Sequence, residues 1–258
     1  MKTFVINLDR HPERLASIRE QLQALCMSFE RISAVDGRTL SQQQLDAVYD
    51  AELVRRTLGR ELAKGEIGCA LSHLIIFHQM VKENISSALV LEDDAQLTPV
   101  LPEILESMSK KMPARQPMVC LLTHVGRYTA WGSKKLAVEN YRLCRTVHAF
   151  CAHGYVINLS AAKVLLKYQR RIRHPIDYWN DLSSKGTVEV RAVVPYVIGH
   201  SDYAQHSSIE ADRIALSQED TLPSMSRFIR RAKLRCYDKF IYQLIKPLLR
   251  IKKQEQTF

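Results

Sequence analysis

The sequence predicts an α/β fold whose amino-terminal part is a parallel sheet. An apolar run over residues 3–7 is followed by a helical pattern in which Leu15, Ile18 and Leu22 share one face, and then by a second apolar run over residues 29–35. This strand–helix–strand order is the repeating unit of parallel sheets. The chain has 258 residues, of which 46% are hydrophobic and 25% charged. That composition supports the core of one large domain or two small ones and excludes a disordered chain.

The alternation of strands and helices continues along the chain. Residues 41–64 are polar and are expected to form a short helix and a mobile loop, after which Gly65 begins a longer helix. We expect the buried face of that helix to hold Ile67, Leu71, Leu74, Ile75, His78 and Val81. Further strands are predicted at residues 87–91, 118–122, 143–147, 154–158 and 188–194, and further helices at 102–110 and from residue 160 onward.

The positive charge is concentrated at the carboxyl end. The net charge is +10, and residues 224–258 carry ten Lys or Arg against two acids, which is +8 of that total. We therefore expect a nearly neutral body over residues 1–223 and a basic tail over residues 224–258. Apolar residues recur every three or four positions between Ile229 and Leu248, which predicts an amphipathic helix over residues 225–253, interrupted at Pro247.

A basic amphipathic helix favours an anionic membrane surface. The alternative is a terminal helix that packs on the body and exposes a basic edge. A third hypothesis is that the basic tail binds nucleic acid. The nearly neutral body and the lack of a recognised nucleic-acid-binding motif argue against it.

The sharpest local signal is a run of three acids, Glu92, Asp93 and Asp94, directly after an apolar strand. Adjacent carboxylates at a buried strand end repel one another unless a cation or hydrogen bonds compensate. Such carboxylates suit Mn²⁺ or Mg²⁺, which prefer oxygen ligands. Strand alternation predicts that Glu92 and Asp94 point to one side and Asp93 to the other. A solvated acidic turn is the alternative.

Two other residues are candidates for the same chemistry. His200 lies in a polar loop over residues 199–207 that also holds His206, so it either completes a metal shell or is a surface residue. Asp177 follows a proline and precedes two aromatic residues. It is either a general base or the N-cap of a helix that runs toward Leu182.

Other common catalytic and binding motifs are missing from the sequence. There is no G-x-S-x-G nucleophile motif, no G-x-G-x-x-G after the first strand and no phosphate-binding P-loop motif. None of the six cysteines forms a C-x-x-C pair, so their spacing predicts no zinc site. With no export signal at the amino end, we expect reduced thiols in a cytoplasmic protein.

Six blocks, in order, resemble glycosyltransferase family 25, the lipooligosaccharide and collagen galactosyltransferase family. The blocks are VINLDRHPER at residues 5–14, KGEIGCALSH at 64–73, VLEDDA at 90–95, GYVIN at 154–158 with AAK at 161–163, HPID at 174–177, and SIEADR at 208–213. They cover roughly residues 3–213. One departure is Cys151-Ala152-His153, where the family commonly has Gly-Thr-Ala; His153 is either an acceptor-specificity element or a strand residue.

The resemblance implies a GT-A fold, a Rossmann-like sheet that binds a UDP-sugar through a divalent metal, and an inverting transfer. On this reading Glu92, Asp94 and His200 hold Mn²⁺ or Mg²⁺, and Asp177 is the general base. Asn7, Arg10, Arg14 and Asp93 bind the nucleotide and its phosphates.

The resemblance further implies UDP-galactose as donor and a lipooligosaccharide as acceptor. The enzyme would work on the cytoplasmic face of the bacterial inner membrane. The competing class is a binding module of the same fold that has no activity.

Overall fold

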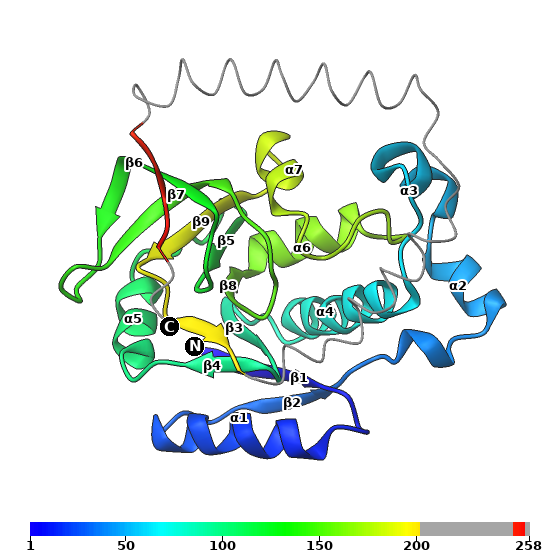
Figure 1. Cartoon of the computed structure of the whole chain (residues 1–258), viewed down its shortest axis with the longest axis horizontal. Coiled ribbons are helices and arrows are strands. Elements are labelled where there is room, and N and C mark those ends of the chain that lie inside the picture. Colours follow the sequence, from blue (N-terminus) through cyan, green and yellow to red (C-terminus); the bar gives the residue numbers. More distant parts are fainter. Residues whose placement is uncertain (202–249, 256–258) are drawn as a thin grey trace.

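The computed structural model describes residues 1–201 and 250–255. In chain order the helices and strands are β1 (Lys2–Asn7), α1 (Pro12–Ala24), β2 (Glu30–Ser33), η1 (Gly37–Thr39), α2 (Gln42–Val48), α3 (Ala51–Leu58), α4 (Lys64–Lys82), β3 (Ser87–Glu92), β4 (Ala95–Leu97), α5 (Leu101–Ser109), β5 (Met118–Leu121), β6 (Arg127–Lys135), β7 (Arg142–His148), β8 (Gly154–Asn158), α6 (Leu159–Tyr168), α7 (Trp179–Ser184), β9 (Glu189–Val194), β10 (Ile198–His200) and β11 (Ile251–Lys253). The predicted α/β class is confirmed (Figure 1).

One large sheet organises these elements, in the strand order β11-β6-β7-β9-β5-β8-β3-β1-β2. β1 pairs in parallel with both β2 and β3, as the opening of the sequence predicts. The sheet as a whole is mixed, because β8 runs antiparallel to both of its neighbours, β3 and β5. This reversal places the start of β8 beside the carboxyl end of β3, where Gly154 pairs with Leu91.

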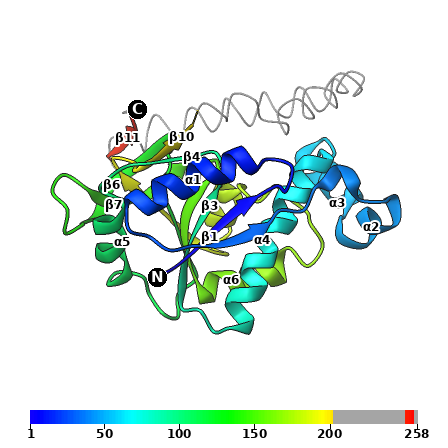
Figure 2. The same ribbon diagram turned by 90° about the horizontal axis from the view of Figure 1, so that it is seen from below.

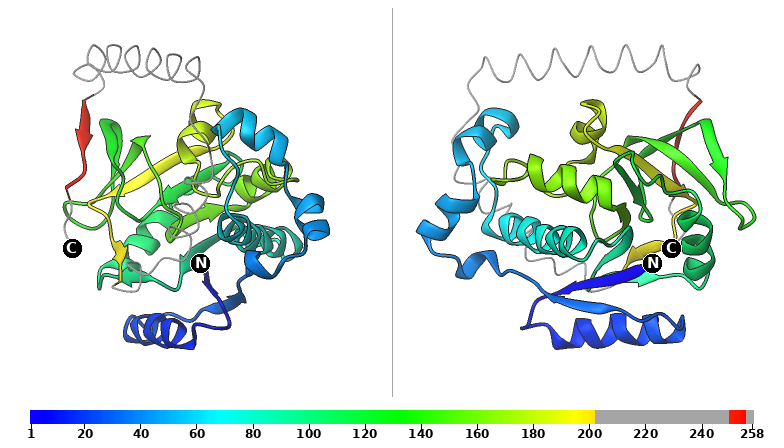
Figure 3. Two further views of the ribbon diagram at one scale, coloured as in Figure 1. Left: turned by 45° about the vertical axis from the view of Figure 1, so that its right-hand side comes forward. Right: turned by 180° about the vertical axis from the view of Figure 1, so that it is seen from behind.

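Helices cover both faces of the sheet (Figures 1 and 2). In β1, Val5 packs into the core that holds residues of α1 and α5, whereas Phe4 and Ile6 pack into the core that holds residues of α4 and α6. The period-two alternation of a strand thus fills two cores from one apolar run, because both faces of this sheet are buried. Helices α4 and α6 lie side by side over their face (Figure 3).

The buried face of α4 differs from the predicted one. Ile75 and Val81 are 41% and 37% exposed, and His78 is also exposed. The buried residues are Glu66, Ile67, Gly68, Ala70, Ser72, His73, Leu74, Ile76, Phe77 and Met80. Because α4 packs against both α6 and elements of the sheet, its buried face is wide, and its apolar residues alone did not identify that face.

Two segments contain more regular structure than the sequence predicts. Residues 41–64 hold two helices, α2 and α3, in addition to the start of α4. Strands β4, β6 and β10 were also missed, and β10 pairs with β4 outside the large sheet. β6 has only one buried residue and carries few apolar residues, so it lacks the pattern of a buried strand.

The predicted carboxyl-terminal helix is wrong at its end. Most of it lies outside the described residues, but Ile251–Lys253 form β11, which pairs antiparallel with β6. Gln254 holds this strand in place, because its Oε1 accepts a hydrogen bond of 2.7 Å from the buried Val125 N–H. The division of the chain at residue 223 stays a prediction. Within the described residues, no helix is long and apolar enough to cross a bilayer.

Candidate active site

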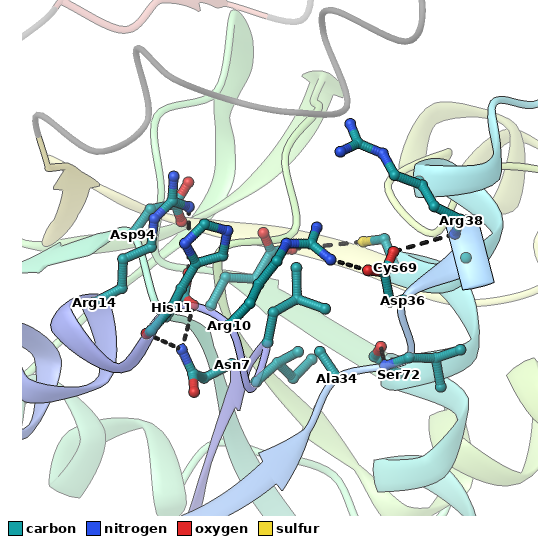
Figure 4. Close-up of a pocket in the computed structure, with 17 residues that line it drawn as sticks. Asn7, Arg10, His11, Arg14, Ala34, Asp36, Arg38, Cys69, Ser72 and Asp94 are labelled. Atoms are coloured by element: carbon teal, nitrogen blue, oxygen red, sulfur yellow. Dashed lines mark hydrogen bonds and ion pairs between the residues drawn. The ribbon is translucent and has the colours of Figure 1, made fainter.

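A pocket opens at the carboxyl ends of β1, β2 and β3 (Figure 4). It is lined by Ile6, Asn7, Leu8, Arg10, His11, Arg14, Ala34, Val35, Asp36, Gly37, Arg38, Gly65, Cys69, Ser72, Glu92, Asp93 and Asp94. Open α/β sheets bind ligands at this edge. Of the predicted site residues, the pocket brings together Asn7, Arg10, Arg14 and all three acids; it does not include Asp177 or His200.

Asn7 organises the floor of the pocket. Its Nδ2 donates to Asp93 Oδ2 at 2.7 Å and to the His11 carbonyl at 2.9 Å, and its Oδ1 accepts from Arg31 Nε at 3.1 Å. The residue is 1% exposed. Both ends of the amide are therefore used inside the protein, so Asn7 fixes Asp93 and the start of α1 rather than presenting a free amide to a ligand.

Basic side chains stand over this floor. Figure 4 shows Arg10 paired with Asp36 and Arg14 beside Asp94. Arg14 Nη1 lies 3.6 Å from Asp93 Oδ1. Asp36 follows β2 and accepts from the Arg38 amide at 3.1 Å. Asp36 also lines the pocket, and the sequence analysis did not single it out.

Asp94 is the carboxylate whose charge is least compensated. Burial, followed by the charges of Glu92 and Asp93, raises the pKa of Asp94 from 3.8 to about 7. Its Oδ1 is buried without a hydrogen-bond partner. Burial also raises the pKa of Asp93, although the hydrogen bond from Asn7 acts in the opposite direction. A buried acceptor beside two further acids has the chemistry of a hard cation site.

Glu92 is held by a buried chain of hydrogen bonds that the sequence did not reveal. His73 Nε2 lies 3.2 Å from Glu92 Oε1, and His73 Nδ1 lies 2.7 Å from the Tyr155 hydroxyl oxygen. Cys69 Sγ lies 3.9 Å from the same carboxylate oxygen. Burial opposes ionisation of Glu92, but the hydrogen bond with His73 and the charges of His73, His153 and His200 together lower the pKa of Glu92. The sequence feature that could have indicated these hydrogen bonds is the serine–histidine pair that ends the block at residues 64–73.

The alternation predicted for the three acids applies only as far as the end of β3. Glu92 is the last residue of β3, and Asp93 and Asp94 form a turn, so period-two geometry ends before them. All three acids line the same pocket, although the Glu92 carboxylate contacts His73 and the Asp93 carboxylate contacts Asn7.

The block at residues 64–73 positions its side chains from the start of α4. Glu66 accepts from Arg60 Nη1 at 2.7 Å and from the Ala63 amide at 2.9 Å, so it anchors the helix end. Gly68 allows α4 to touch the chain after β2, because a Cβ there would lie 2.4 Å from the Val35 carbonyl oxygen. This close approach helps set the distance between α4 and the edge that carries the acids.

His200 lies next to the acids but belongs to a different cluster. It is the last residue of β10, not a loop residue, and the following Ser201 N–H donates to the Asp94 carbonyl at 2.8 Å. Its ring lies 3.7 Å from the ring of His153, centre to centre. Within residues 1–201 and 250–255, three-ligand groups with all ligand atoms within 4.8 Å contain Cys151, His153 and His200, or Cys69, His73 and Glu92. No such group joins Glu92, Asp94 and His200. His206 lies outside the described residues.

Asp177 does not line this pocket. The hydrogen bond with Glu66 raises the pKa of Arg60, and the charge of Asp177 adds a smaller contribution in the same direction. The alternative reading of Asp177 as a helix cap is wrong. The N-cap of α7 is Tyr178, and no side chain caps that helix.

The chain was compared with known proteins. The family model described as glycosyltransferase family 25 (LPS biosynthesis protein) matches residues 1–179. Procollagen galactosyltransferase 1 of Danio rerio is 29% identical over 177 residues, which is 64% of this chain and 28% of the relative. A glycosyltransferase 25 family member of Drosophila melanogaster is 32% identical over 174 residues, 64% of this chain and 27% of the relative. The inactive glycosyltransferase 25 family member 3 of Mus musculus is 30% identical over 173 residues, 65% of this chain and 29% of the relative.

Solved structures are more distant. A glycosyltransferase involved in the glycosylation of the major capsid of PBCV-1 aligns with a TM-score of 0.40 and 10% identity, over 84% of this chain and 98% of that one. The galactosyltransferase LgtC, in complex with donor and acceptor sugar analogs, aligns with a TM-score of 0.39 and 11% identity, over 88% of this chain and 99% of that one.

The chain spans less than a third of the length of the curated relatives it matches. The family model, in contrast, covers more than half of this chain and includes β1, α4, β3 and β8, the elements that carry the site. The chain therefore belongs to glycosyltransferase family 25.

Proposed function

We propose that this chain is an active glycosyltransferase that takes a sugar from a nucleotide-sugar donor bound in the pocket between β1, β2 and β3. One observation carries the proposal: Arg10 and Arg14 stand in the same pocket as Asp94, a buried carboxylate with an unpartnered oxygen. A diphosphate needs positive charge, and the carboxylate would hold the cation that accompanies it.

The donor occupies the pocket with its diphosphate toward Arg10 and Arg14. Asp36, at the end of β2, is positioned to accept hydrogen bonds from the ribose, as an acidic residue does in Rossmann-type sheets. The donor would displace Arg10 from its ion pair with Asp36. Asn7 acts through Asp93, which it orients, and does not contact the nucleotide.

Mn²⁺ or Mg²⁺ would be held by Asp94 together with Glu92. Such ions often use one or two carboxylates and complete their coordination with substrate phosphates and water, so a third protein ligand is not required. When bound, the ion would neutralise the charge that develops on the diphosphate leaving group. His73 and Tyr155 keep Glu92 oriented and ionised for this role.

We propose UDP-galactose as donor and a lipooligosaccharide as acceptor, with inversion at the anomeric carbon. The support is the resemblance in sequence, the description of the family model as an LPS biosynthesis protein, and the name of the zebrafish galactosyltransferase. Asp177 remains our candidate for the base that takes the acceptor proton, although it lies outside the donor pocket. The acceptor would then bind between the donor pocket and Asp177.

The test is release of UDP from UDP-galactose with purified lipooligosaccharide, with and without Mn²⁺. Wild-type protein should turn over only with a divalent cation, and Asp94→Ala should abolish transfer and weaken Mn²⁺-dependent binding of UDP. Asp177→Asn should bind UDP normally and lower kcat by about 10²–10⁴-fold. Glu20→Gln, an exposed change on α1, is the matched control.

Each alternative gives a different result. A chain that binds UDP-galactose and releases no UDP with any acceptor would be a binding module, as the name of the mouse relative suggests for that protein. Transfer by Asp94→Ala at saturating Mn²⁺ would refute the metal assignment. Unchanged kcat in Asp177→Asn would move the base to another residue.

We also propose that the basic residues between 225 and 249 hold the enzyme on the cytoplasmic face of the inner membrane. The support is the concentration of charge in the sequence, since those residues lie outside the described structure. Each Lys or Arg near an anionic surface contributes about 1 kcal/mol. Replacing Arg230, Arg231 and Lys233 by Gln should therefore lower partitioning onto phosphatidylglycerol vesicles by roughly 100-fold. Equal partitioning of the two proteins would refute the proposal.

A further inference from the structure

Three side chains with metal-binding atoms meet beside the acids but outside the donor pocket. Cys151 Sγ, a ring nitrogen of His153 and a ring nitrogen of His200 all lie within 4.8 Å of one another. In sequence, His200 is far from the other two. The reversed direction of β8 causes this meeting, because it brings the segment before β8 to the carboxyl end of β3, where β10 and β4 also pair.

His153 is the member of this cluster whose ring lacks hydrogen-bond partners. It is 4% exposed, and both of its ring nitrogens are buried without a hydrogen-bond partner. An imidazole that is buried without partners loses its hydrogen bonds to water and gains none within the protein. In a neutral imidazole one ring nitrogen carries a lone pair that can bind a metal ion. A metal ion bound there would give that nitrogen a partner.

The backbone around the cluster is fixed on all three sides. Trp179 Nε1 donates to the Cys151 carbonyl at 2.9 Å, and the Glu92 N–H donates to the His153 carbonyl at 3.0 Å. His200 pairs with Ala95 in the two-stranded sheet. Ligands held on paired strands and by buried hydrogen bonds keep their geometry better than ligands on open loops. The exposure of His200 leaves an entry path for an ion.

We propose that Cys151, His153 and His200 form a second metal site that binds Zn²⁺. One thiolate and two imidazoles suit zinc, whereas Mg²⁺ and Mn²⁺ prefer the carboxylate oxygens at Asp94. Three protein ligands leave the fourth tetrahedral position open to water. His200 is thereby assigned to this site and not to the ion of the donor. The ion ties the connection before β8 to the end of β10. This inference does not depend on the proposed transfer reaction.

The experiment uses full-length protein freed of metal by chelation and then titrated with Zn²⁺ alone, with a chromogenic chelator as competitor. Co²⁺ is titrated separately, because a thiolate ligand gives Co²⁺ a near-ultraviolet charge-transfer band. We expect one Zn²⁺ per chain and a Co²⁺ band. Cys151→Ser should abolish that band, and His153→Ala should weaken Zn²⁺ binding by at least about 10-fold, the smaller loss seen when a metal site is altered even in its outer shell.

Cys69→Ser is the control for the other group of ligands, Cys69, His73 and Glu92, and it should keep both the band and the affinity. Far-UV circular dichroism of the apo variants shows whether each still folds. If a variant does not fold, His200→Ala, at an exposed position, is tested in its place. A band lost in Cys69→Ser and kept in Cys151→Ser would overturn the proposal, as would Zn²⁺ binding that none of the three ligand variants weakens or a chain that takes up no Zn²⁺.

Discussion

Replacing Asp94 by Asn should stabilise the protein while removing its activity. In the folded chain, burial and the neighbouring acids raise the pKa of Asp94 from 3.8 to about 7. Each pKa unit corresponds to about 1.4 kcal/mol, so holding this carboxylate ionised costs on the order of 4 kcal/mol of folding free energy. Asn keeps the shape of the side chain and carries no charge, so the variant should recover much of that free energy.

The sign of the effect depends on pH. Below pH 3.8 the carboxyl is protonated in both the folded and the unfolded chain, and it contributes nothing. Between pH 3.8 and about 7 the unfolded chain loses the proton first, so the folded chain binds more protons and stability falls as pH rises. Above pH 7 both states are ionised and the full penalty remains. The stabilisation by Asp94→Asn should therefore be small near pH 4 and largest at pH 8.

Urea unfolding in buffer with a chelator, at pH 4.5 and at pH 8, measures this difference. Glu20→Gln removes a charge from an exposed position and should show no comparable change between the two pH values. Adding Mn²⁺ at pH 8 should raise the stability of the wild type and leave Asp94→Asn nearly unchanged, because the cation binds the ionised carboxylate. Wild-type protein as stable as Asp94→Asn at pH 8 without metal would refute the reasoning.

Three further changes test the supports of the site, all by urea unfolding. Gly68→Ala should lower the free energy of unfolding by about 1–3 kcal/mol, because its Cβ would lie 2.4 Å from the Val35 carbonyl oxygen. An unchanged urea midpoint would contradict the close packing of α4. Tyr155→Phe should lower the free energy of unfolding by about 1–3 kcal/mol, because buried His73 Nδ1 is left unpaired, and kcat should also fall. An unchanged stability would mean that the tyrosine does not hold His73. Gln254→Ala should lower the free energy of unfolding by a similar amount, about 1–3 kcal/mol, because the Val125 N–H is left unpaired. An unchanged free energy of unfolding would mean that the carboxyl end is detached from the sheet.

The amino-terminal half of the site could be predicted because its signals are local. The apolar run before Asn7, the helix that begins at Pro12 and the acids after residue 91 each follow from neighbours in sequence. Parallel pairing of β1 with β3 then brings these residues to one edge. Position alone did not reveal the role of each residue: Asn7 lines the pocket as expected, but its amide is used inside the protein.

What could not be predicted depends on contacts between distant segments. His73 and Tyr155 are 82 positions apart, and each looks like an ordinary residue of its helix or strand. Cys151, His153 and His200 meet only because β8 runs against its neighbours, and no periodicity reports the direction of a strand in a sheet. The missed β6 has only one buried residue, so the burial that makes a strand recognisable is nearly absent there.

The pairing of β11 with β6 changes how the carboxyl-terminal region should be engineered. Because the chain returns to the sheet at Ile251, residues 202–249 form an insertion tethered at both ends. Cutting the chain before residue 250 removes β11, one of the two neighbours of β6, and leaves unpaired N–H and C=O groups along a new edge strand, the kind of surface on which sheets aggregate.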